Sequence, residues 1–170
     1  LRDIFNADKT GLFYRALPTK PMSVKGEDAK SKDRITVLLA CSPEGEKLMP
    51  FVIGRSANPR CFKGLTSLAC LPVSYSSNKT AWMTAELFNQ WLDKLNSKMK
   101  RVGWSILLFV DNCTSHPGVQ FSNVKLIFLP PNTTSKLQPG IIQATKMHYR
   151  KLLLRHVLFH MNEASKASDL

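Results

Sequence analysis

The stretch that decides the fold of this chain is Ser105-Ile106-Leu107-Leu108-Phe109-Val110-Asp111. Its long apolar run is typical of a strand that is buried on both faces in the middle of a sheet. Asp111 follows at the carboxyl end of that strand, where a side chain is held rigidly at the edge of the sheet. A second aspartate, Asp8, ends the apolar segment that begins at Ile4. We therefore expect Asp8 and Asp111 to meet in space.

Several other segments have the composition of strands. Residues 4–8 and 12–17 flank Thr10-Gly11, which we interpret as a turn, and residues 34–41 and 47–53 flank a second turn at 42–46. This part of the chain is therefore expected to form a meander of antiparallel strands. Residues 73–75 and 124–129 are expected to be further strands, and residues 18–33 and 132–135 are expected to be loops.

Two segments have helical periodicity. The first begins at Thr84, a capping residue, and ends at Gly103, which predicts an amphipathic helix of about five turns. A second helix is expected after Pro139. Its buried stripe is expected to contain Ile142, Tyr149, Leu153, Val157 and Met161. Strands followed by helix, strand, strand and helix indicate one α/β layered domain over residues 1–170.

The composition favours a polyanionic partner. The 170 residues include 24 basic and 12 acidic side chains, a net charge of +12, and such a surface attracts nucleic acid, although a merely solvated surface remains an alternative. The four cysteines form no CxxC pair, which is typical of reduced intracellular thiols. No apolar stretch reaches the roughly 20 residues of a membrane helix, so no membrane contact is expected. Because the chain begins at Leu1, we expect it to be part of a longer protein.

Asp8 and Asp111 are the candidate catalytic and metal-binding residues. Mg²⁺ prefers oxygen ligands, and two metal ions roughly 3.5–4 Å apart can activate an attacking oxygen and stabilise a leaving one in phosphoryl transfer. An aspartate that ends a strand is also common as a turn or helix-cap residue. The two residues alone leave both interpretations open.

Four strings carry a family resemblance: NADKTGLF from Asn6, AWMT from Ala81, VDNCTSH from Val110 and LPPNTTSKLQP from Leu129. In this order, and over nearly the whole chain, they resemble the DDE superfamily endonuclease domain of pogo- and Tigger-type transposases. The resemblance extends to jerky-like and centromere-box-binding proteins. It implies a ribonuclease H-like mixed sheet flanked by helices, ancestry in DNA transposition with Mg²⁺ or Mn²⁺, DNA as a partner, and a nuclear location. The helix-turn-helix region that precedes this domain in the family is not within these residues.

The chain departs from the family pattern at two places. The family's first motif reads Asn-x-Asp-Glu-Thr-Gly, and Lys9 stands here in place of the glutamate, where a cation repels Mg²⁺. The family's Leu-Gln-Pro-Leu-Asp-Gln-Gly holds its third metal aspartate, but residues 137–140 read LQPG. After Asp111 the only acids are Glu163 and Asp169, and Glu163 is roughly 35 Å along a helix from Gly140. We therefore expect a weakened metal site and little or no cleavage.

Two further groups of residues are candidates. His116 and Asn112 are accessory candidates near the aspartates, and His116 either contacts phosphate or a metal-bound water or is a loop histidine bonded to backbone. A basic group is expected either to neutralise DNA phosphates or to form a solvated helix face. It consists of Lys136, Lys146, Arg150 and Lys151.

Three functions remain open on the sequence alone. The first is a DNA-binding domain with impaired catalysis. The second is an active endonuclease whose site is completed by another group or by a partner chain, for example in a homo-oligomer. The third is a protein-interaction module of a chromatin-associated protein. The missing Leu-Asp-Gln can also reflect a splice variant, a decaying gene copy or a gene-model error.

Overall fold

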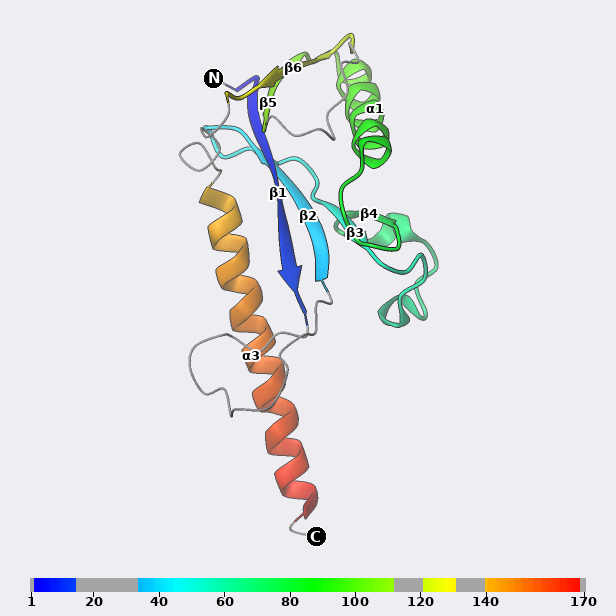
Figure 1. The fold of residues 1–170 in the computed structure, drawn as a ribbon, viewed down its shortest axis with the longest axis vertical. Coiled ribbons are helices and arrows are strands. Elements are labelled where there is room, and N and C mark those ends of the chain that lie inside the picture. Colours follow the sequence, from blue (N-terminus) through cyan, green and yellow to red (C-terminus); the bar gives the residue numbers. More distant parts are fainter. Residues whose placement is uncertain (1, 15–33, 112–120, 131–139, 169–170) are drawn as a thin grey trace.

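The computed structural model describes residues 2–14, 34–111, 121–130 and 140–168. They form a mixed sheet of six strands in the order β4-β3-β2-β1-β5-β6, with a helix on each face (Figure 1). The elements are β1 (Ile4–Phe13), β2 (Arg34–Cys41), β3 (Phe51–Gly54), β4 (Ser74–Ser77), α1 (Ala85–Arg101), β5 (Ile106–Val110), β6 (Val124–Phe128) and α3 (Gly140–Ser168). Two short 3-10 helices, Arg60–Phe62 and Leu68–Cys70, lie between β3 and β4. This architecture confirms the expected α/β fold.

Of the central strands, β2 and β5 agree with the prediction from the sequence, whereas β1 does not. β2 has the predicted bounds, and β5 lies between β1 and β6 as its apolar run predicts. The predicted turn at Thr10-Gly11 is wrong, because β1 runs through both residues and Gly11 pairs with Thr36 of β2. An unbroken antiparallel ladder from Asn6 to Phe13 satisfies the backbone of this segment, which a local turn would interrupt. Residues 15–17 of the predicted second strand lie outside the described residues.

Two predictions for the side of the sheet that contains β3 and β4 need correction. The expected strand over residues 47–53 begins only at Phe51, after Pro50, which has no N–H to donate to a ladder, and Lys47 makes an isolated bridge with Cys41. The strand predicted at residues 73–75 is observed at Ser74–Ser77, and it pairs in parallel with β3. The antiparallel meander is therefore confirmed for β1, β2 and β3 and does not extend to β4. The predicted loops at 18–33 and 132–135 fall outside the described residues.

The helix α1 covers one face of the sheet. Thr84 caps it, since the Thr84 hydroxyl accepts a hydrogen bond from the Leu87 N–H at 3.3 Å, and Gly103 follows its end with a φ of +65°. Its apolar side buries Leu87, Phe88, Trp91, Leu92, Leu95 and Met99 against the sheet. These observations confirm the predicted helix and its caps.

The helix α3 lies on the opposite face. Ile142 packs there with Leu12, Val37 and Leu39, and Tyr149 lies beside this cluster. Leu153, also in the predicted stripe, is half-buried, while the side chains of Val157 and Met161 lie outside the described set. In Figure 1 the first half of α3 runs along β1, and its C-terminal half continues past the end of that strand. Part of α3 is therefore not covered by the sheet.

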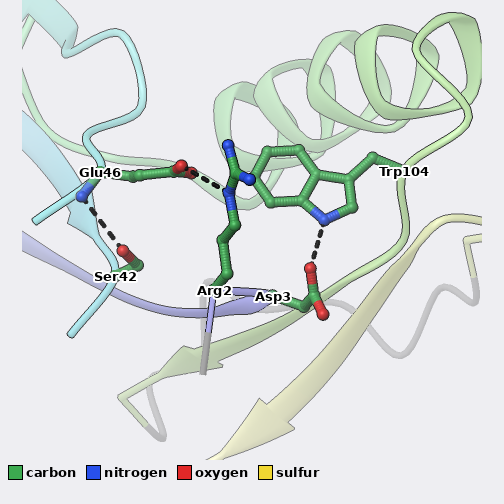
Figure 2. A network of polar contacts seen from close by, with 5 residues as sticks. All are labelled: Arg2, Asp3, Ser42, Glu46 and Trp104. Atoms are coloured by element: carbon green, nitrogen blue, oxygen red, sulfur yellow. Dashed lines mark hydrogen bonds and ion pairs between the residues drawn. The ribbon is translucent and has the colours of Figure 1, made fainter. Parts of the chain in front are cut away.

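The start of β1 is anchored by a polar network (Figure 2). The Arg2 Nε donates to Glu46 Oε1 at 2.8 Å, and the Glu46 N–H donates to the Ser42 hydroxyl at 3.1 Å. The Trp104 indole N–H donates to the Asp3 carboxylate, and the Arg2 guanidinium lies 6.0 Å from the centre of the Trp104 ring. These contacts tie the start of β1 to the turn after β2 and to the segment before β5. They hold β1 and β5 in register just before the candidate site.

Candidate functional site

The register of β1 and β5 brings the two candidate aspartates together. The strands pair in parallel from Ile4 with Leu107 to Ala7 with Val110, and Asp8 and Asp111 are the residues that directly follow the last pair. Neighbouring strands are about 4.8 Å apart. Asp111 follows β5 directly, as expected, but Asp8 lies within β1 and not at a strand end. Asp8 is consequently 7% exposed, and its carboxylate is held by the centre of the sheet.

Lys9 contacts both aspartates. Its backbone N–H donates to Asp8 Oδ1 at 2.7 Å, and its ammonium Nζ lies 3.3 Å from Asp111 Oδ2. Both side chains of this ion pair are largely shielded, with 23% of Lys9 and 24% of Asp111 exposed. Because β5 ends at Val110 while β1 continues to Phe13, the Lys9 side chain can cross the end of β5 to reach Asp111. The sequence marked Lys9 as a departure from the family pattern but did not predict this contact.

Among the residues that the structure describes, the side chains near Asp8 and Asp111 do not fit a site for two divalent metal ions. Within residues 2–14, 34–111, 121–130 and 140–168, no three His, Cys, Asp or Glu side chains gather where they could hold a metal ion. Asp8 and Asp111 supply two carboxylates, and one of them already binds the Lys9 ammonium. The donor set that the family resemblance implies is therefore incomplete in the described part of the chain.

The basic candidates that the structure describes lie together on α3. Lys146, Arg150, Lys151 and Arg155 line a shallow hollow of about 720 Å³ along the helix. Residues four apart are neighbours on a helix surface, so Lys146 with Arg150 and Lys151 with Arg155 form two basic rows that flank the hollow. We call the side of α3 that carries both rows its basic face. Arg155 was not among the sequence candidates, although its four-residue spacing from Lys151 is the signal that identifies it. Lys136, His116 and Asn112 fall outside the described residues.

Apolar side chains lie among these cations. Met147, Leu154 and Leu158 line the same hollow, and each is exposed. Tyr149, also on α3, is half-buried, and this burial, with a smaller contribution from Tyr14, raises the pKa of its phenol. Tyr149 therefore stays neutral at physiological pH and adds no negative charge to the helix. The resulting face of α3 combines positive charge with apolar surface.

The family string that starts at Ala81 lies in the connection between β4 and α1. The Ala81 carbonyl accepts a hydrogen bond of 2.6 Å from the Thr36 hydroxyl, and its φ of +53° redirects the chain between β4 and α1. The next residue, Trp82, is exposed, and the Arg34 guanidinium lies 3.7 Å from the centre of its ring. This part of the family resemblance therefore positions the start of α1 on the sheet.

Comparisons with known proteins agree with this architecture. The family model described as DDE superfamily endonuclease matches residues 32–169. The chain is 40% identical to Tigger transposable element-derived protein 4 of Mus musculus, in an alignment that covers 97% of the chain and 33% of that protein. It is 30% identical to the jerky protein homolog of Homo sapiens, over 95% of the chain and 32% of that protein.

A third relative is the major centromere autoantigen B of Homo sapiens, with 32% identity over 90% of the chain and 26% of that protein. The chain thus spans a third or less of the length of these relatives. No solved structure matches it. None of the described helices is long and apolar enough to span a bilayer. The match over most of the chain, together with the mixed sheet and its two helical layers, establishes that this chain belongs to the DDE superfamily endonuclease family.

Proposed function

We propose that this chain is a transposase-derived domain that binds DNA and does not cleave it. The observation that carries the binding part is the basic face of α3, where Lys146, Arg150, Lys151 and Arg155 line one hollow. The net charge of +12 supplies long-range attraction to a polyanion. Relatives whose names refer to transposable elements and to the centromere support DNA as the polyanion and the nucleus as the location.

The absence of cleavage follows from the charges around Asp8 and Asp111. Phosphoryl transfer by two metal ions depends on ligands that hold both ions against the attacking and leaving oxygens. This chain lacks the family's third aspartate, and Lys9 forms an ion pair with Asp111. Mg²⁺ or Mn²⁺ is therefore expected to bind weakly here. DNA that reaches the domain would be held without being cut.

A binding experiment tests this proposal. Fluorescence anisotropy would be measured with a labelled duplex of mixed sequence in EDTA at low salt. We expect binding without divalent metal, and replacement of Lys146, Arg150 and Lys151 by glutamine should weaken it. The matched control removes three exposed cations from α1 by replacing Lys94, Lys98 and Arg101, and it should retain most of the affinity. Absence of binding by the unaltered chain at 50 mM salt would contradict the proposal.

The apolar side chains of α3 favour a second candidate, a docking site for an acidic segment of a chromatin protein. Met147, Leu154 and Leu158 are exposed between the cations, and a DNA backbone offers them no apolar contact. An acidic amphipathic segment would match both the charge and the apolar surface. Binding of such a partner that persists with excess competitor DNA would favour this candidate.

Formation of a homo-oligomer through the same face would appear instead as a concentration-dependent mass in analytical ultracentrifugation.

A further inference from the structure

We propose that Lys9 is a built-in cation that takes the place of a divalent metal ion at the Asp8–Asp111 pair. The inference deepens the proposed function and rests on it for the assignment of these two aspartates as the ancestral metal ligands. The question is which group now balances the negative charge of these two aspartates. We infer that a lysine side chain, which is covalently part of β1, has replaced a metal ion that could dissociate.

The two carboxylates need a positive partner. Asp8 and Asp111 directly follow the last residue pair of β1 and β5, Ala7 with Val110, and Asp8 is 7% exposed. Carboxylates that are removed from water are stable only when they are paired, hydrogen-bonded or bound to a metal. Two of them at neighbouring positions also repel each other. In an active enzyme of this type, divalent ions relieve that repulsion.

Lys9 supplies this relief from within the strand. Its N–H donates to Asp8 Oδ1 at 2.7 Å, and its Nζ lies 3.3 Å from Asp111 Oδ2. One residue thus contacts both carboxylates, one through its backbone and one through its charge. The backbone of Lys9 is fixed because it pairs with Leu38 of β2 inside the sheet. The ammonium is therefore tethered within reach of Asp111 by a backbone position that the sheet fixes.

The same position works against a metal ion. The Lys9 ammonium lies 3.3 Å from Asp111 Oδ2 and Mg²⁺ lies about 2.1 Å from a ligating oxygen, so an ion on this oxygen would stand no more than about 5.4 Å from the ammonium. Two cations at that separation repel strongly in a site that is only partly open to water. The metal would bind only after the lysine had left the carboxylate. Lys9 thus both offsets the charge of one of the two carboxylates, that of Asp111, and lowers the affinity of the site for divalent ions.

The consequence is a domain whose folded state does not depend on divalent metal. A ligand that binds only the folded state stabilises a protein by an amount that grows with the logarithm of the ligand concentration above Kd, so a metal-dependent site would make the melting temperature rise with Mn²⁺. Here the melting temperature should be the same in EDTA and in Mn²⁺. Replacing Lys9 by methionine keeps the length of the side chain and removes its charge. That change should convert the site into one that responds to metal.

The test is a Mn²⁺ titration by calorimetry, with melting temperatures measured in parallel. The variants are Lys9→Met, Lys9→Glu, Lys9→Arg and Asp111→Asn, and Lys94→Met on the exposed side of α1 is the matched control. We expect Lys9→Met and Lys9→Glu to bind Mn²⁺ at least about tenfold more tightly than the unaltered chain. Their melting temperatures should rise by about 2–4 °C or more in saturating Mn²⁺. Lys9→Arg and Lys94→Met should behave like the unaltered chain.

Two results would overturn the proposal. One is Mn²⁺ binding by a folded Lys9→Met variant that is no tighter than Mn²⁺ binding by the unaltered chain. The other is a Lys94→Met variant that gains as much affinity as Lys9→Met. If Lys9→Met does not fold, the comparison of the unaltered chain with Asp111→Asn decides the question, since equal weak binding by both supports the proposal. DNA binding and nicking are separate measurements, so failure of the proposed function would be recognised independently.

Discussion

The basic face of α3 makes a quantitative prediction about DNA binding. Lys146 and Arg155 are nine residues apart in a helix, or about 14 Å along its axis. Duplex DNA carries one phosphate charge per about 1.7 Å of its axis, so this length of duplex holds about eight phosphates, enough for all four cations. Each neutralised phosphate contributes about 0.9 to the slope of log K against log salt. Replacing Lys146, Arg150 and Lys151 by glutamine should therefore lower that slope by about 2.7.

The assay is fluorescence anisotropy with a labelled duplex over a series from 50 to 200 mM NaCl. Over this fourfold range, a slope difference of about 2.7 means that the unaltered chain loses about 40-fold more affinity than the triple variant does. The α1 variant, in which Lys94, Lys98 and Arg101 are replaced by glutamine, has the same net charge as the α3 variant. Its slope should stay within about 1 of the unaltered value. Equal slopes for the two triple variants would refute the assignment of α3 as the DNA-binding face.

Two further predictions concern the core and the thiols. Leu92 of α1 is completely buried in the main core, so Leu92→Ala should lower the free energy of unfolding by about 2–5 kcal/mol in urea denaturation, and a loss below about 1 kcal/mol would contradict the described packing. Burial raises the pKa of the Cys41 thiol, an effect that the Lys47 ammonium partly opposes, so less thiolate is present at a given pH. Cys41 should therefore react with iodoacetamide more slowly than the exposed Cys61 at pH 8, with the difference narrowing at higher pH, as peptide mass spectrometry can measure; equal rates at pH 8 would contradict it.

The elements with strong local signals were predictable from the sequence. The helix α1 has a capping threonine, a terminal glycine and regular apolar spacing, and all three are observed. β5 was predicted by its apolar run, which is long enough for a strand and continuous enough for a central position. In each case the information lies within a few consecutive residues. Local energetics and tertiary packing favour the same conformation there.

Errors arose where the conformation depends on a distant partner. Thr10-Gly11 has the composition of a turn, but pairing with β2 along the length of β1 keeps it extended. The parallel pairing of β4 with β3 likewise depends on how the chain returns to the sheet after Gly54. Neither outcome is encoded in the local sequence. The tertiary contacts of the sheet decide both.

In the candidate site, too, the features set by local sequence were predictable and those set by distant contacts were not. The sequence identified Asp8, Asp111 and the unusual Lys9, because each stands at a recognisable position of the family motifs. It did not predict that Lys9 binds Asp111, since that contact requires the register of two strands and the earlier end of β5. The basic residues of α3 were predictable in part, through their four-residue spacing. Arg155 joins them because the helix continues in the same register.

The domain keeps the family fold, and we propose that it does not cleave DNA. The most direct test is nicking of supercoiled plasmid in Mn²⁺ by the unaltered chain, beside Asp8→Ala as the background control. A positive control combines Lys9→Glu with insertion of Leu-Asp-Gln between Pro139 and Gly140. We expect the unaltered chain to nick no faster than Asp8→Ala, and the combined variant to gain metal-dependent nicking. Metal-dependent nicking by the unaltered chain that disappears in Asp8→Ala would show instead that the domain is an active nuclease.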